Sequence, residues 1–236
     1  MGFSLYGTFH ISWLLVTIFT VILVSIYFKA ADNKSRKILQ VSFAWFLVVF
    51  ELIKDVYLIL HNEFTFNYLP FELCSLAMVA ILYHAYTDSL IVGDMLYNIF
   101  LPGGIAALLF CNWTDRSIYE FMCSFSFIYH LVLVAYCVMV LYAGVVKPDK
   151  KRIWYSCLFL LIAASILYPL NQFLGTNFMF LSIPSPGSPL VVLEQIFGNP
   201  GYIFGLALII AVLWSILYLP WRKIFTVRSY SYRFNK

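Results

Sequence analysis

Seven long apolar segments are the feature of this chain that most constrains its fold. A helix needs about 20 residues to cross a hydrocarbon core of about 30 Å. Only 11% of the residues are charged and 63% are hydrophobic, whereas a soluble domain has about 25% charged residues. The sequence therefore predicts an all-α membrane protein, a bundle of seven transmembrane helices that forms one integral-membrane domain over residues 1–236. The predicted spans are about 9–28, 38–60, 70–87, 90–110, 118–143, 153–173 and 200–219.

The basic residues predict the orientation of this bundle. All Lys and Arg residues except Lys54 and Arg116 lie in the three segments that follow the first, fifth and seventh apolar runs. With seven spans these segments face one side, so the positive-inside rule places the N-terminus outside and the C-terminus inside. The formal charge of +4 is thereby assigned to topology and lipid headgroups, and nucleic acid is excluded as a partner. We expect a multi-pass integral membrane protein, in the cell membrane if the source is bacterial.

Charged residues in the second span are candidates for a site. An ionisable residue inside a span is costly and usually faces the bundle interior or a cavity. Glu51 and Asp55 are four residues apart and share a helix face, and Lys54 is close enough to compensate both carboxylates. An interhelical polar clamp and a catalytic or substrate-binding role are both consistent with this pattern.

The fourth span holds a second polar pair. Asp94 and Asn98 share a helix face and precede Pro102-Gly103-Gly104. This tripeptide predicts a break or kink in the helix, where freed backbone groups can bind a ligand; a kink that serves packing is the simpler interpretation.

The segment LPFELCSL, residues 69–76, predicts a reactive thiol. Pro70 suits the first position of a helix, which places Cys74 just past the first turn, where the positive helix end favours a thiolate. His130 lies roughly 18 Å into the fifth span at 1.5 Å per residue, as either a satisfied core histidine or a general base. A thiolate with an imidazole base is an acyl-transfer nucleophile, although Cys74 is shallower by about 10 Å unless the third span begins inside the membrane. Glu72 is first a helix-start residue and second a member of the site.

The remaining cysteines and the longest loop predict little chemistry. Only Cys111 of the five cysteines is expected to be exposed on the outer side, without an evident partner, so we expect no structural disulfide. We also expect no metal and no cofactor. The loop 174–199 contains three prolines that prevent a continuous helix. Its LVVLEQIF segment predicts a short amphipathic helix, which either covers the mouth of the bundle or lies in the membrane interface.

Four segments together resemble a known family. They are, in chain order, LPFELCSL, PGGIAALL, IYHLVLV with the histidine of the fifth span, and NFMFLSIPSPGSPL. In this order, and across most of the chain, they resemble the YwaF / transmembrane protein 164 family, and the wider fold resembles the androgen-induced-gene membrane hydrolases, which cleave lipid esters.

The resemblance implies an intramembrane enzyme that acts on membrane lipids. Cys74 would attack a donor ester and carry the acyl group as a thioester, and His130 would act as general base and then as general acid. Asn98 or Asn177 would supply oxyanion donors, by residue type. One departure is Glu72, where we expect many members to carry histidine.

The sequence thus predicts a lipid acyltransferase or acyl-ester hydrolase, and it leaves alternatives open. The first is a small-solute or lipid transporter that uses Glu51, Lys54 and Asp55, although the chain has no evident repeat symmetry of the transporter kind. The second is a non-catalytic membrane scaffold. Protein partners and the acyl acceptor, water or a lysolipid, are not defined by the sequence.

Overall fold

The computed structural model describes residues 2–219, which form helices and connecting segments without a strand. The chain divides into two compact units, Met1–Ser188 and Pro189–Lys236, and each is described by itself. The basic tail that contributes to the predicted orientation lies outside the described residues. It consists of Arg222, Lys223, Arg228, Arg233 and Lys236.

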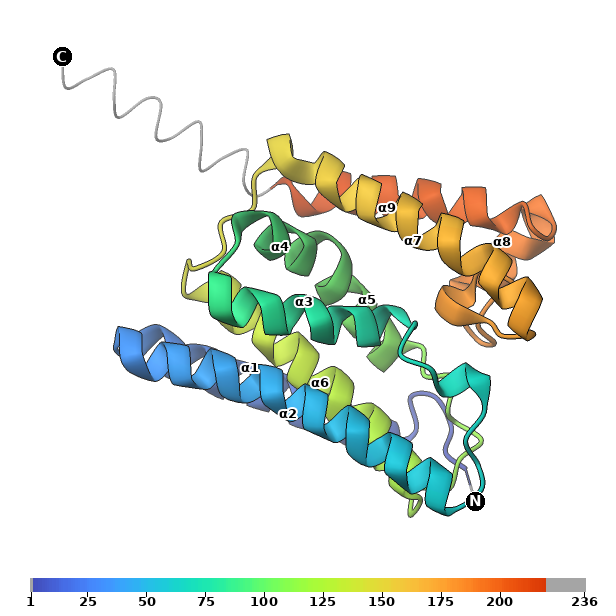
Figure 1. Cartoon of the computed structure of the whole chain (residues 1–236), viewed down its shortest axis with the longest axis horizontal. Helices are drawn as coiled ribbons and strands as arrows, with labels where there is room; N and C mark the ends of the chain where they lie inside the picture. Colours follow the sequence, from blue (N-terminus) through green and yellow to red (C-terminus); the bar gives the residue numbers. More distant parts are fainter. Residues whose placement is uncertain (1, 220–236) are drawn as a thin grey trace. The chain divides into compact units, whose positions relative to one another are not determined.

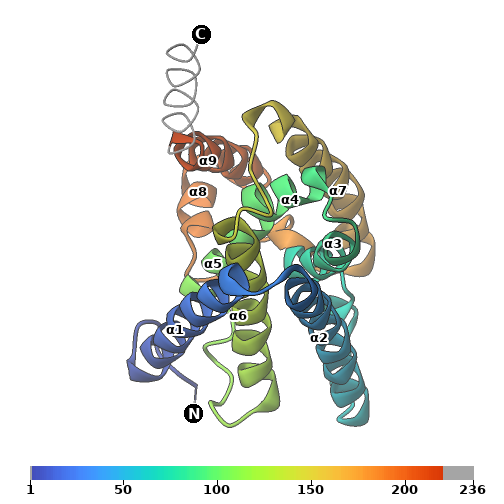
Figure 2. The same cartoon turned by 90° about the vertical axis from the view of Figure 1, so that its left-hand side faces the viewer.

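The first unit is built around a single central helix. Helix α6 packs against α1, α2, α3 and α5, and Figure 2 shows it between α1 and α2. In chain order the α-helices of this unit are α1 (Thr8–Ala30), α2 (Asn33–Leu60), α3 (Leu73–Thr87), α4 (Leu90–Met95), α5 (Leu101–Leu109), α6 (Phe121–Tyr142) and α7 (Ile153–Leu174). Short helical turns are η1 (Phe66–Tyr68), η2 (Leu96–Phe100), η3 (Lys150–Arg152) and η4 (Phe178–Phe180).

All seven predicted apolar segments are helical, and five helical stretches are long and apolar enough to cross a membrane. These five are Thr8–Ala30, Phe66–Thr87, Leu90–Leu109, Phe121–Tyr142 and Lys150–Leu174. The other two predicted spans correspond to α2, which carries charged residues, and to α9 (Tyr202–Leu217) in the second unit, which has only 16 residues. A transmembrane assignment for α2 and α9 stays a prediction.

In the second half of α2 the exposed face is apolar, while charged side chains are among its buried residues. Glu51 and Lys54 are only 5% and 6% exposed, while Leu52 and Val56 are 58% and 55% exposed. A helix in water shows the opposite arrangement. Together with the five long apolar helices, this pattern indicates a membrane protein.

The fourth predicted span is distorted before its proline and not at it. The turn η2 is a π-helix in which the Leu101 N–H bonds to Leu96 O, and the backbone then stays helical through Pro102 into α5. The helix is therefore not broken at Pro102-Gly103-Gly104, whereas the kink that the tripeptide also predicts stays a prediction. Proline has no N–H to donate to the preceding turn, and the chain accommodates this loss by widening that turn.

The two glycines after Pro102 let α5 approach its neighbours closely. A Cβ atom on Gly103 would lie 2.9 Å from Leu73 Cδ2, and one on Gly104 would lie 2.9 Å from Leu133 Cδ2. Helix α5 thus packs closely against the first residue of α3 and the middle of α6. This packing fixes the start of α3, where Cys74 lies.

The opposite end of the first unit is tied by buried polar contacts. Asp94 is fully buried, and it accepts hydrogen bonds from Arg152 Nε at 2.5 Å and Arg152 Nη2 at 3.1 Å. His84 Nδ1 lies 2.8 Å from the Tyr136 hydroxyl. These contacts join α4 to the α6–α7 connection and α3 to α6, which accounts for the buried aspartate without a functional role.

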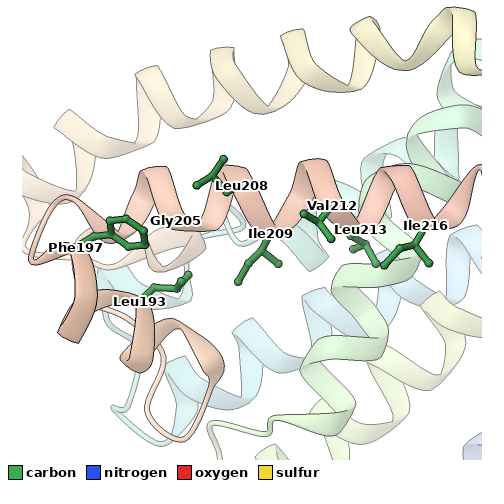
Figure 3. A pocket seen from close by; sticks show the side chains of 8 residues that line it. All are labelled: Leu193, Phe197, Gly205, Leu208, Ile209, Val212, Leu213 and Ile216. Atoms are coloured by element: carbon green, nitrogen blue, oxygen red, sulfur yellow. The ribbon is translucent and has the colours of Figure 1, made fainter.

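Residues 189–219, the described part of the second unit, form two helices with an apolar groove between them. Helix α8 (Pro189–Phe197) confirms the short helix predicted from LVVLEQIF, whereas its role as a cover over the bundle stays a prediction. The groove has a volume of about 380 Å³, and Figure 3 shows the side chains around it. They are Leu193, Phe197, Gly205, Leu208, Ile209, Val212, Leu213 and Ile216.

Candidate functional site

Cys74 lies at the very start of α3. The helix begins at Leu73, with Glu72 as its N-cap residue, so Cys74 is the second helical residue. The predicted start at Pro70 is wrong, because residues 69–72 form turns after η1. Cys74 is half-buried. Its thiol therefore lies in the first turn itself, where the positive end of the helix acts most strongly on a thiolate.

Four polar side chains gather beside this thiol. Lys54 Nζ lies 2.7 Å from Glu51 Oε1 and 3.2 Å from Asp55 Oδ1, and the Ser75 hydroxyl donates to Glu51 Oε1 at 3.3 Å. We call Glu51, Lys54, Asp55 and Ser75 the polar cluster. Since Ser75 follows Cys74 directly, the cluster joins α2 to the start of α3.

Tyr129 brings α6 to the level of Cys74. Its hydroxyl donates to the Cys74 carbonyl oxygen at 3.4 Å, and its ring is almost fully buried. Side chains of a helix lean toward its N-terminus, so a tyrosine nine residues into α6 reaches the first turn of α3. The hydrogen bond places the end of the Tyr129 side chain at the level of the Cys74 backbone.

His130 has one ring nitrogen available as a base. His130 Nδ1 lies 2.7 Å from the Ser126 carbonyl oxygen, and because a carbonyl only accepts, Nδ1 carries the proton. The neutral ring then presents an unprotonated Nε2, the state that a general base requires. The ring stacks on Trp113 with centroids 5.5 Å apart and an angle of 12°, which fixes its orientation.

Cys74 and His130 are not hydrogen-bonded to each other, and the contact between their helices at this point is made by Tyr129. Among residues 2–219, no hydrogen bond joins Cys74 Sγ to the His130 ring. Catalytic hydrogen bonds often form only when substrate binds. The roles of both residues stay predictions.

Glu72 holds a strained segment over the start of α3. Its carboxylate accepts a hydrogen bond from the Met179 N–H at 3.0 Å. Met179 and Phe180 have φ angles of 56° and 53°, a left-handed conformation that costs energy for residues other than glycine. Glu72 thus fastens the α7–α8 connection to the helix that carries Cys74, and its own side chain makes no capping bond.

The two asparagines predicted as oxyanion donors are engaged elsewhere. Asn98 lies in η2, and its Nδ2 donates to the buried Ser156 hydroxyl at 3.0 Å. Asn177 accepts the N–H groups of Ser182 and Ile183, each at 3.0 Å, and donates to Ile183 O at 2.8 Å. In this structure Asn98 joins η2 to α7 and Asn177 organises local backbone, and an oxyanion role for them stays a prediction.

Asn171 in α7 is the main anchor of the strained segment. It is buried, and its side chain bonds the Phe178 N–H at 2.8 Å, Phe178 O at 3.0 Å and the Thr176 hydroxyl at 2.9 Å. Asn171→Ala should destabilise residues 176–180 locally by about 1–3 kcal/mol, because buried partners are left unsatisfied. Hydrogen exchange of the backbone amides of residues 176–180 would measure this loss of local stability. Exposed Gln172→Ala is the control, and equal protection in both variants would contradict the prediction.

Cys111 Sγ lies 3.5 Å from His10 Nε2, and this contact is structural. His10 Nδ1 accepts from the Tyr6 N–H at 2.9 Å, so Nε2 carries the proton and donates to Leu108 O at 2.7 Å. Cys111 also donates to Leu108 O at 3.3 Å, and burial raises the pKa of its thiol to about 12. The expectation that Cys111 is exposed is wrong, since it is 2% exposed. With both nitrogens of His10 occupied, this pair has no free base.

Tyr129, Trp113 and Ser75 were not singled out from the sequence. Tyr129 and Ser75 are next to the predicted residues His130 and Cys74, so adjacency was the available signal. Trp113 lies in a connecting segment, and no pattern indicates which helix it covers. Within residues 2–219, no group of three His, Cys, Asp or Glu side chains is placed to hold a metal ion.

The comparisons with known proteins identify the family. Residues 5–218 match the TMEM164 family, which covers every helix described above. None of the curated proteins and none of the solved structures compared matches the chain. Because the matched region spans most of the sequence, the chain belongs to the TMEM164 family.

Proposed function

We propose that this protein acts on acyl esters of membrane lipids, with Cys74 as nucleophile and His130 as base. Two observations support the proposal: a half-buried thiol lies in the first turn of α3, and the residue after Tyr129 is a histidine whose Nδ1–H is held by Ser126 O. Helix and hydrogen bond each favour the reactive form of one partner. Tyr129 links the two positions.

The reaction has two balanced steps. In the first, the Cys74 proton passes to His130 Nε2, the sulfur forms a bond to the ester carbonyl carbon, and the carbon–oxygen bond breaks. The leaving alkoxide takes the proton from His130, and a thioester remains on Cys74. In the second, His130 removes a proton from the hydroxyl of water or of a lysolipid, and the oxygen forms a bond to the thioester carbonyl carbon. The carbon–sulfur bond breaks, and the Cys74 thiolate takes the proton back from His130. Water gives hydrolysis and a lysolipid gives acyl transfer.

The contacts of the polar cluster support a structural role for it in the proposed enzyme. Lys54 Nζ lies within 3.2 Å of a carboxylate oxygen of both Glu51 and Asp55, and the Ser75 hydroxyl donates to Glu51 Oε1 from α3. The cluster therefore serves as the interhelical clamp that positions the start of α3.

The membrane topology of the proposal has seven spans with the N-terminus outside. The apolar exposed face and the buried charged side chains in the second half of α2 support its membrane placement. Lys37 in α2 pairs with Asp88 after α3 at 3.0 Å, and Arg152 reaches Asp94 in α4. The basic side chains of two separate connections thus lie at the end of the unit opposite Cys74.

The test is direct detection of the acyl-enzyme. Purified protein in nanodiscs would be mixed with a phospholipid that carries a labelled acyl chain, and peptide mass spectrometry would locate the label. We expect the acyl mass on Cys74. Exposed Cys157 is an internal control for non-specific acylation, and a label equally distributed over both thiols, or none on Cys74 across a broad panel of donors, would refute the proposal.

A further inference from the structure

Trp113 carries a buried hydrogen-bond donor that no residue within 2–219 accepts. Trp113 is only 8% exposed, and its indole Nε1 is the one buried side-chain nitrogen of this part of the chain without a hydrogen-bond partner. A buried tryptophan N–H usually finds a partner, and a buried donor that is left unsatisfied costs free energy. Such a group in a folded protein indicates a strained, catalytic or ligand-binding position.

Aromatic packing holds the Trp113 indole against the proposed base. The ring centroids of Trp113 and His130 are 5.5 Å apart at an angle of 12°, and those of Trp113 and Phe127 are 5.4 Å apart at 82°. Phe127 and His130 are three residues apart and share one face of α6. The Trp113 carbonyl oxygen also accepts the Arg116 N–H at 3.2 Å. Both the ring and the backbone of Trp113 are therefore fixed, and its N–H is a preorganised donor.

Helix α5 connects Trp113 to both halves of the candidate site. Trp113 lies four residues after the end of α5, and the two glycines of α5 pack against Leu73 and Leu133. Leu73 directly precedes Cys74 in α3, and Leu133 follows His130 by about one turn of α6. The segment that continues from α5 is thus anchored to the helix of the proposed nucleophile and to the helix of the proposed base.

The N-terminus encloses the same segment from another side. The Phe3 N–H donates to Thr114 O at 2.9 Å, and the Phe3 ring lies 5.6 Å from the Phe127 ring. Figure 1 shows the N-terminus at this end of the unit. The residues around position 113 therefore lie between the N-terminus and α6, which accounts for the low exposure of Trp113.

The proposed reaction supplies an acceptor for this donor. When the Cys74 sulfur forms its bond to the ester carbonyl carbon, the carbonyl oxygen takes the negative charge, and the carbonyl forms again when the bond to the leaving alkoxide breaks. An indole N–H only donates, so it matches this oxygen in both states, and the bond strengthens as the charge develops. Asn98 and Asn177, which were predicted for this role, donate to groups of the protein.

We propose that the indole N–H of Trp113 donates a hydrogen bond to the carbonyl oxygen of the acyl ester and to the oxyanion that this oxygen becomes. The inference rests on the proposed function and adds a catalytic residue to it. Trp113 then has two tasks, because its ring orients the imidazole of His130 and its N–H stabilises the tetrahedral intermediate. A donor that is fixed in a water-excluded site is worth far more than the same donor in water.

Nuclear magnetic resonance of the indole groups tests the contact without turnover. Cys74→Ala protein labelled with ¹⁵N-tryptophan, in detergent, would be titrated with a short-chain diacylglycerophosphocholine and with its dialkyl ether analogue, which has no carbonyl oxygen. The six tryptophans would be assigned by replacing them one at a time with phenylalanine. We expect the Trp113 N–H signal to move downfield with the ester and less with the ether. Equal shifts with both probes, or no shift with saturating ester, would overturn the contact.

Trp113→Phe removes the donor and keeps an aromatic ring against His130. It should lower kcat for ester turnover by about 10²- to 10³-fold, the usual cost of losing an oxyanion donor. KM should change less than about threefold, because the bond is strongest in the transition state. Trp13 in α1 stacks on Phe127 with centroids 5.0 Å apart at 3°, and Trp13→Phe is the matched control that should leave kcat within about twofold. Equal kcat values for the two folded variants would contradict a role of the Trp113 N–H. If Trp113→Phe does not fold, the comparison of ester and ether on the native indole decides.

The two proposals fail separately. A Trp113 shift that requires the ester carbonyl, together with no acyl adduct on Cys74, refutes the enzymatic function alone. An acyl adduct that forms at the wild-type rate in Trp113→Phe refutes the role of the indole N–H alone.

Discussion

His130→Ala should lower acyl-ester turnover by about 10²- to 10⁴-fold, the usual contribution of a general base. The alanine variant has no Nε2 to accept the Cys74 proton, so the thiol stays protonated and the ester is attacked slowly. The measurement is the release of a labelled fatty acid or of a labelled acylated lysolipid by protein in nanodiscs. The loss should appear in kcat, because His130 takes part in the transition state.

A second histidine provides a matched control. His61 Nδ1 lies 2.8 Å from the Tyr57 carbonyl oxygen, four residues earlier, which is the same local bond that His130 makes with Ser126. His61 is exposed at the end of α2. His61→Ala should therefore leave turnover within about twofold of the wild type. Equal losses in the two variants would mean that His130 acts through stability and not as a base.

The sequence predicts the helices well because their driving force is local. A run of apolar residues has to leave water whatever its neighbours are, so each of the seven predicted segments is helical. The ends of these helices depend on tertiary contacts. Helix α3 begins at Leu73 and not at Pro70 because Leu73 is packed under Gly103 of α5, a contact that no local pattern reveals.

The fourth span shows the same limit. Pro102 does predict an irregularity, but proline is compatible with either a break or a widened turn before it. The outcome is the π-turn η2, with all five of its residues buried. Packing by α3, α6 and α7 keeps the chain helical there, and this packing is absent from the sequence pattern.

The candidate site was predictable by residue type and not by contact. Cys74 and His130 stand out because polar groups are rare in spans. Their relation depends on Tyr129, whose hydroxyl reaches Cys74 O, and helical spacing alone cannot show which helix α6 faces. Cys111 was misjudged for the converse reason, since its loop position predicts exposure while His10 and Leu108 enclose it.

Lys54→Met should destabilise the protein by about 3–5 kcal/mol, the cost of leaving a buried charge without its partner. The side chains of Lys54 and Glu51 are each only 7% exposed, so water cannot replace the ammonium. A lowered midpoint of unfolding in detergent would show the effect. Lys37→Met removes the ammonium of a pair whose side chains are 40% and 47% exposed, and it should cost at most about 1 kcal/mol.

The double variant Glu51→Gln/Lys54→Met tests whether the stability lost in Lys54→Met comes from the unpaired charge of Glu51 or from the lost contacts of the lysine. Removing both members of a buried pair is often neutral or stabilising, and glutamine still accepts from the Ser75 hydroxyl. We therefore expect the double variant to recover most of the stability lost in Lys54→Met. Recovery would show that Lys54 is present to neutralise Glu51. If the double variant is as unstable as the single one, the contact of Lys54 with Tyr68 O is the interaction that matters, and the clamp at the start of α3 is made by the lysine alone.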